Sequence, residues 1–241
     1  MAFLQPQPSD PWTRQPVFRA PPVVISLIAI LVAAHGARAM VAPNISAELI
    51  NQFAFIPARY SPAFLAMHNA DPGGWLAQAV PFVSYMALHN DITHLIINSL
   101  WLLAFGPIVA RRFGGFLFLL FFVTCGVAGA LTHLVFNWGS LVPVIGASGA
   151  ISGLMAAGLR LLPAQAPWAR ADAEEMAPIF SRQILVFTAI WMAINLAAGL
   201  TGLGMGGEAG LIAWQAHLGG YLAGLFLAGP FDRLRPRLNA I

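Results

Sequence analysis

Long apolar runs constrain this chain more than any other feature of its sequence. A helix needs roughly 20 apolar residues to cross a lipid hydrocarbon core of about 30 Å. Six stretches meet this requirement, although one of them is short: Val23 to Val41, Pro81 to Ala110, Gly114 to Phe136, Ser148 to Leu162, Ile179 to Leu203 and Gly210 to Ala228. The sequence therefore predicts an all-α, polytopic membrane protein with six transmembrane helices. The lipid bilayer is its expected surroundings and one of its expected partners.

The composition excludes several other classes. Of the 241 residues, 59% are hydrophobic and only 9% are charged, far from the values of soluble proteins. The single cysteine, Cys125, lies in an apolar run and is expected to be a small buried residue, so no disulfide framework is available. The net charge of +3 is too scattered to form a nucleic-acid-binding surface. No nucleic-acid partner is predicted.

The basic residues, all of them arginine, predict the orientation in the membrane. Short cytoplasmic loops carry the excess of positive charge. If both termini are cytoplasmic, only Arg38 and Arg59 lie outside, and the other ten arginines lie inside. Ala37-Arg38-Ala39 resembles a signal-peptide cleavage site, but the apolar run before it is long and its preceding tail is not strongly basic. We expect an uncut first helix and cytoplasmic termini, and the lysine-free, alanine-rich composition favours a bacterial inner membrane.

Polar side chains interrupt three of the predicted spans. Ionisable residues are costly in lipid and face a cavity or one another, so each is a functional candidate. They are His89, Asp91, His94 and Asn98 in the second span, the Gly146-Ala147-Ser148-Gly149 opening of the fourth, and His217 in the sixth.

These side chains are predicted to lie at one depth. Asn98 precedes Arg111 by thirteen residues, Ser148 precedes Arg160 by twelve, and His217 precedes Pro230 by thirteen. At about 1.5 Å per residue, each lies roughly 18 to 20 Å above the cytoplasmic face, with His94 one turn above Asn98. The fourth span is only about 22 Å long, so it must begin below the outer surface, beside a watery cavity.

A serine, a histidine and several hydrogen-bond donors at one depth indicate acyl-transfer chemistry. A neutral imidazole such as His217 can take the proton of the Ser148 hydroxyl. The helix N-terminus at Ser148, together with His94 and Asn98, supplies donors for an oxyanion. Gly146 and Gly149 would let a substrate backbone approach closely.

Each residue also has a structural interpretation. Ser148 between glycines could be a close helix contact, His217 an interior polar residue, and Asn98 a bridge between helices. Gly220 and Gly224 are interpreted as a helix-packing pair. His89 and His94 lack the spacing and the glutamate of a zinc-binding H-E-x-x-H motif, so no metal and no cofactor is expected. His133 and Asn195 are secondary candidates.

The motifs together resemble the rhomboid family. They are His89, His94 and Asn98, then Gly146-Ala147-Ser148-Gly149, then Ala216-His217 with Gly220 and Gly224, in the family's order. The resemblance implies a six-helix bundle that hydrolyses peptide bonds in or near transmembrane segments of membrane-protein substrates. It implies a Ser148 and His217 dyad, an oxyanion hole of His94, Asn98 and the Ser148 amide, and a supporting role for His89.

On this basis the chain divides into four parts. Residues 1–21 are a disordered cytoplasmic tail, 22–73 the first transmembrane helix and the start of an outer loop, 74–229 the rhomboid catalytic core, and 230–241 a cytoplasmic tail.

The sequence departs from the family pattern in three places. Ser152 stands where many relatives have a tyrosine packed on the catalytic histidine. Arg111 and Arg112 lack the usual acidic neighbour, and Trp75 and Arg59 are not the adjacent pair typical of the first loop. A catalytically inactive, client-binding rhomboid relative and a small transporter are the alternative functions. The sequence gives no indication of the substrate or the oligomeric state.

Overall fold

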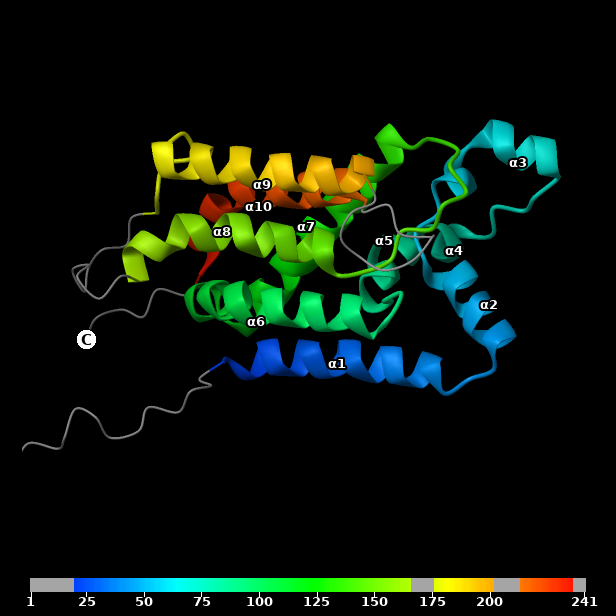
Figure 1. Cartoon of the computed structure of the whole chain (residues 1–241), viewed down its shortest axis with the longest axis horizontal. Coiled ribbons are helices and arrows are strands. Elements are labelled where there is room, and N and C mark those ends of the chain that lie inside the picture. The colour runs from blue at the N-terminus through cyan, green and yellow to red at the C-terminus, as the bar shows by residue number, and fades with distance from the viewer. Residues whose placement is uncertain (1–19, 166–175, 202–212, 236–241) are drawn as a thin grey trace, which may run out of the picture.

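Helices account for the regular structure of the described residues, which are 20–165, 176–201 and 213–235 of the computed structural model. The predicted all-α class is confirmed. Six long helices run side by side along the long axis of the molecule (Figure 1). They are α1 (Pro22–Ala39), α6 (Ile92–Phe113), α7 (Gly115–Phe136), α8 (Ser148–Gln165), α9 (Arg182–Thr201) and α10 (Trp214–Leu234).

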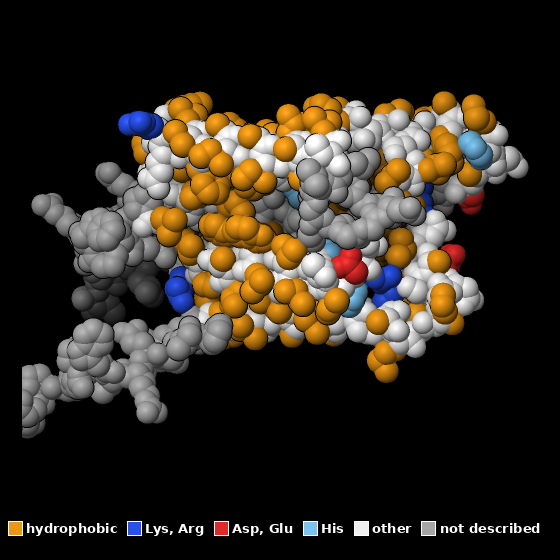
Figure 2. Space-filling view, viewed as in Figure 1, with side chains coloured by type: hydrophobic (Ala, Val, Ile, Leu, Met, Phe, Trp, Pro, Cys, Tyr) orange, Lys and Arg blue, Asp and Glu red, His pale blue; other side chains and the backbone are white. Residues whose placement is uncertain are grey.

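The outer surface of the bundle is apolar, as a lipid-facing surface must be. Among the described residues, α1, α6, α7 and α9 are each long and apolar enough to cross a membrane, and α8 contributes a shorter apolar helix. Hydrophobic side chains cover the flank of the helices and charged side chains lie toward the ends (Figure 2). Ile30, Leu100 and Ile194 are examples of exposed apolar side chains on three different helices. The chain is a polytopic membrane protein.

The second span is not the continuous helix predicted from Pro81 to Ala110. Two short turns, α5 (Pro81–Ser84) and η2 (Tyr85–Ala87), are followed by an extended segment, and α6 begins only at Ile92. The cause is Asp91, whose extended backbone and side chain form an N-cap. Its carboxylate accepts the His94 N–H at 2.9 Å. His89 and Asp91 therefore precede the helix, contrary to the prediction.

The sixth helix extends further than predicted at its C-terminal end. Pro230 lies inside α10, which continues to Leu234, so the first residues of the predicted C-terminal tail are helical. Arg112 at the end of α6 forms a bidentate ion pair with Asp232 of α10, at 2.6 and 3.0 Å. The acid missing beside the arginines in sequence is thus supplied by another helix. Residues 202–203 and 210–212, at the ends of two predicted spans, lie outside the described residues, as do residues 1–19.

The long outer connection has internal structure. It contains α2 (Pro43–Phe53), η1 (Pro57–Tyr60), α3 (Pro62–His68) and α4 (Trp75–Ala79), gathered at one end of the bundle (Figure 1). Phe55 and Val144 exchange two backbone hydrogen bonds, at 3.1 and 2.8 Å. This bridge anchors the loop that leads into α8.

Glycines bring α8 and α10 into backbone contact at the centre of the bundle. A Cβ at Gly220 would collide with the carbonyl of Gly149, and one at Gly224 with the backbone of Gly153. Side chains are therefore excluded along this seam, which sets the separation of the two helices. Ser148 and His217 lie at the outer end of the same seam.

Candidate active site

Ser148 and His217 meet at the outer end of the α8–α10 seam. Ser148 is the first residue of α8, and His217 lies in the first turn of α10. The Ser148 Oγ is 2.7 Å from Nε2 of His217, a hydrogen-bond distance. Both side chains are partly buried. A serine hydroxyl bonded to an imidazole can transfer its proton to that ring.

The other ring nitrogen of His217 contacts α9. Nδ1 of His217 is 2.6 Å from Oδ1 of Asn195. The Asn195 amide in turn donates through Nδ2 to the Trp191 carbonyl, at 2.8 Å. Both nitrogens of the imidazole are thus occupied, one by a hydroxyl and one by an amide oxygen.

His94 and Asn98 lie on α6, one helical turn apart. A Cβ placed on Gly146 would lie 2.8 Å from the Cε1 and Nε2 atoms of His94 and 3.8 Å from the Ser148 Oγ. The His94 ring edge therefore lies against the backbone just before the serine. Asn98 is buried one turn along, and its Nδ2 donates to the His94 carbonyl at 2.9 Å. That NH₂ group has a second hydrogen to donate.

The backbone that enters α8 is held in a conformation suited to glycine. Gly146 has φ +115°, which side-chain-bearing residues rarely adopt. Its N–H donates to the Tyr85 carbonyl at 2.9 Å, and the Tyr85 hydroxyl donates to the Gly126 carbonyl at 2.8 Å. Tyr85 thus links the loop to α7. The orphan N–H groups at the start of α8 face the same region as the serine hydroxyl.

His89 lies beneath His94, outside α6. Its ring is fully buried and meets the His94 ring edge to face, with centroids 5.1 Å apart. Arg38 of α1 donates to the carbonyls of His89 and Asn90, which anchors this segment to the first helix. Beside it, the hydrogen bond from the His94 N–H holds the pKa of Asp91 below its ordinary value. His89 therefore packs against His94, as a residue that supports the site would.

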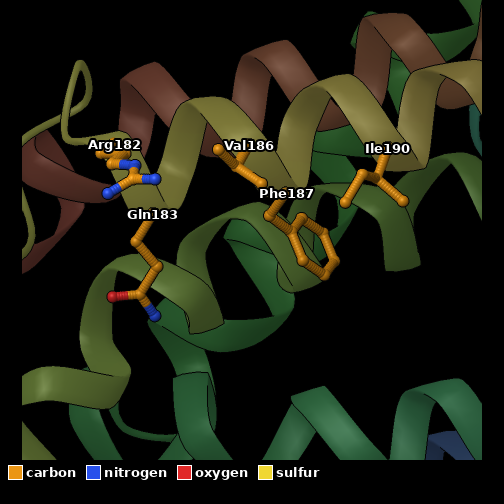
Figure 3. A pocket seen from close by; sticks show the side chains of 5 residues that line it. All are labelled: Arg182, Gln183, Val186, Phe187 and Ile190. Carbon is orange, nitrogen blue, oxygen red and sulfur yellow. The ribbon is translucent and has the colours of Figure 1, made fainter.

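The open groove of about 570 Å³ on α9 is separate from this cluster. It is lined by Arg182, Gln183, Val186, Phe187 and Ile190, all from the first half of that helix (Figure 3). Gln183 and Phe187 point away from the helix into the groove, and no residue of the Ser148 cluster lines it. The chemistry therefore lies elsewhere.

Comparison with known proteins identifies the family. The sequence profile of the Rhomboid domain matches residues 76–232, which is more than half of the chain. The chain belongs to the rhomboid family. Its sequence is 32% identical over 168 residues to Rhomboid protease GluP of Bacillus subtilis (strain 168), covering 69% of this chain and 28% of that protein. It is 29% identical over 194 residues to RHOMBOID-like protein 6, mitochondrial, of Arabidopsis thaliana, covering 75% of this chain and 56% of that protein.

The resemblance read from the motifs is thus confirmed. The matched regions cover only 28% and 56% of the lengths of these two relatives. The matched profile includes α6 to α9 and most of α10.

In this rhomboid, position 152 is a serine and does not supply the aromatic side chain near His217. Ser152 turns back on its own helix, where its hydroxyl donates to the Ser148 carbonyl at 2.7 Å. The aromatic side chain near the histidine comes from α9. The Trp191 ring lies 6.4 Å from the His217 ring and stacks on Tyr221 at 4.6 Å. Packing around the imidazole is therefore supplied by a different helix.

Asn195 is the contact that the sequence interpretation undervalued. From the sequence alone, Asn195 is only a secondary candidate. A signal was present, since Asn195 follows Arg182 by thirteen residues and so lies at the depth calculated for His217. The other secondary candidate, His133, is buried in α7, where its neighbour is Asn137, and it is not part of the cluster.

Proposed function

We propose that this rhomboid is an intramembrane serine protease that cleaves peptide bonds in or near transmembrane segments of membrane-protein substrates. The observation that carries the proposal is the 2.7 Å contact between the Ser148 hydroxyl and Nε2 of His217 at the start of a membrane helix. Family membership supports the same reaction class. A client-binding protein without catalysis has no need of this contact.

The reaction follows from the position of each group. His217 takes the Ser148 proton on Nε2 as the serine oxygen attacks the substrate carbonyl carbon. The carbonyl π electrons move to its oxygen, and the resulting oxyanion accepts hydrogen bonds from the Ser148 N–H, His94 and Asn98. The C–N bond then breaks as His217 gives its proton to the leaving amine, which leaves an acyl-enzyme.

Water completes the cycle by the same groups. His217 takes a proton from the water as its oxygen attacks the ester carbon. The second tetrahedral intermediate collapses with return of the proton to the Ser148 oxygen, and the carboxylic product leaves. The partly exposed site is compatible with water entry from the outer side.

The proposal also includes the orientation of the chain and the membrane in which it lies. We place both termini in the cytoplasm of a bacterial cell and the protein in its inner membrane, with residues 74–229 as the catalytic core. The N-terminus of α1 and the C-termini of α6, α8 and α10 lie at one end of the bundle (Figure 1). Arg111, Arg112, Arg160 and Arg233 belong to this end, which supports a cytoplasmic assignment.

A reporter cleavage assay tests the proposal. The purified full chain should cut a reporter with a single transmembrane segment, and Ser148→Ala should remove that activity while the helical content and the melting temperature remain. Ser152→Ala is the matched control, because this serine lies one turn along the same helix and its hydroxyl bonds the Ser148 backbone carbonyl, not the Ser148 hydroxyl. Equal cleavage by Ser148→Ala would rule out the assignment.

A further inference from the structure

The amide of Asn195 has only one orientation that satisfies its neighbours. Its Nδ2 faces the Trp191 carbonyl at 2.8 Å and its Oδ1 faces Nδ1 of His217 at 2.6 Å. A flipped amide would place two carbonyl oxygens 2.8 Å from one another, with no hydrogen between them. Because the Trp191 carbonyl can only accept, the Asn195 oxygen must face the imidazole.

This orientation determines the tautomer of His217. An amide oxygen accepts and cannot donate, so the Nδ1 that it contacts must carry the hydrogen. A neutral imidazole has one N–H, and Nε2 then carries the lone pair. That lone pair faces the Ser148 Oγ at 2.7 Å. The opposite tautomer would point an N–H at the serine and could not take its proton.

From this geometry we infer that Asn195 is the positioning residue of the base, holding His217 as the Nδ1–H tautomer aimed at Ser148. The inference rests on the proposed function, which it deepens by assigning a third group to the same site. Asn195 does not touch substrate and acts only through the ring of His217. A neutral amide orients the imidazole without the charge that a carboxylate would bring.

Helix α9 makes a second polar contact with α10, which does not involve the His217 ring. Thr188 on α9 is 2.7 Å from the Tyr221 hydroxyl on α10, and neither group touches His217 by hydrogen bond. Trp191 lies between the two contacts and stacks on Tyr221. Loss of the Thr188 contact should loosen α9 from α10 without changing the tautomer. A Thr188 variant therefore distinguishes weaker packing of α9 on α10 from loss of the positioning role of Asn195.

The test compares three variants of the purified full chain. Asn195→Ala should lower kcat by roughly 10- to 100-fold with little change in KM, the usual cost of losing a group that orients a histidine. Asn195→Asp keeps an oxygen against Nδ1 but loses the N–H that donates to the Trp191 carbonyl, so it should recover only part of kcat at alkaline pH. Thr188→Val, nearly isosteric, should keep kcat within about twofold even if its melting temperature falls.

The pH–rate profile gives a readout that simple loss of packing would not change. Among the described residues, His94 of α6 is the titratable side chain that acts electrostatically on His217, and the His217 ring also lies beside Ser148, Asn195 and Trp191. In Asn195→Asp the new carboxylate stabilises the protonated ring, so the acid limb should move to higher pH. In Thr188→Val it should stay in place. Wild-type kcat in Asn195→Ala, or an acid limb in Asn195→Asp that does not move from its wild-type position, would overturn the inference.

Failure of the inference can be told apart from failure of the proposed function. If the wild type cleaves in a Ser148-dependent way and Asn195→Ala is equally fast, only the positioning role is wrong. If the wild type does not cleave, ring ¹⁵N shifts of His217 still report the tautomer. The inference expects hydrogen on Nδ1 in the wild type and a shift toward a tautomer mixture in Asn195→Ala. Identical spectra would contradict it.

Discussion

Replacing Gly146 by alanine should slow cleavage by about 10- to 100-fold through displacement of His94. Gly146 has φ +115°, and an added Cβ would lie 2.8 Å from two ring atoms of His94. Ordinary carbon contacts are about 3.5–4.0 Å, so the ring must move by roughly 0.7–1.2 Å. A misplacement of about 1 Å can cost 10²-fold, and complete loss of an oxyanion donor costs about 10²- to 10³-fold.

Gly139 provides a matched control in the same loop. It also has a positive φ, +79°, but its nearest neighbour for an added Cβ is the Ser61 Oγ at 3.9 Å. Gly139→Ala should pay a backbone strain of about 1–2 kcal/mol without touching the site. Both variants should melt at lower temperature, whereas only Gly146→Ala should lose kcat in the transmembrane-reporter assay.

A double variant tests whether Gly146→Ala acts through the His94 ring. In a His94→Ala background the alanine at 146 has no ring to displace, so its additional effect on kcat should largely disappear. Wild-type kcat in Gly146→Ala would refute the proposed contact. So would equal kcat losses in Gly139→Ala, or full additivity in the double variant.

Three further predictions concern neighbouring groups and the membrane orientation. Asn98→Ala and His94→Ala should each lower kcat by about 10²- to 10³-fold and leave KM nearly unchanged, and wild-type rates in both would remove them from the oxyanion site. Asp91→Ala should cost about 1 kcal/mol of stability in thermal unfolding. Because the pKa of Asp91 is lowered in the fold, the contribution is present above about pH 3.9 and is lost as pH falls below it, so the variant should match wild type only at low pH. A reporter fused after Arg237 should be cytoplasmic and one near Asp71 external, and an external C-terminus would contradict the orientation.

Hydropathy predicts the spans because lipid leaves the backbone few alternatives to a helix. It does not predict where a helix begins when a local cap competes. Leu88 to Asp91 falls within the predicted second span because the apolar residues on both sides outweigh His89, Asn90 and Asp91, yet the Asp91 cap starts α6 only at Ile92. The pattern of apolar residues carries no information on that choice, although aspartate before an apolar run is itself a capping signal.

Helix rise predicts a common depth for Asn98, Ser148 and His217, and the structure brings Ser148 and His217 into contact. The residues from which the depth is counted are not the helix ends. α6 continues past Arg111, α8 past Arg160 and α10 past Pro230. Because all three helices continue in the same direction past these residues, the depths of the side chains relative to one another change little. Helix rise gives depth but not the rotation of one helix against another. For that reason the contact of Asn195 with His217, and the Trp191 ring in place of the missing tyrosine, required the structure.

Labelling with a fluorophosphonate probe tests the central claim most directly, because such probes react much faster with an activated serine than with an ordinary one. The account predicts one covalent adduct on the wild-type chain, located at Ser148 by peptide mass spectrometry. Labelling should disappear in Ser148→Ala and in His217→Ala and persist in Ser152→Ala. An unlabelled wild-type chain that is folded in detergent, or undiminished labelling of Ser148→Ala, would contradict a nucleophile at Ser148 activated by His217.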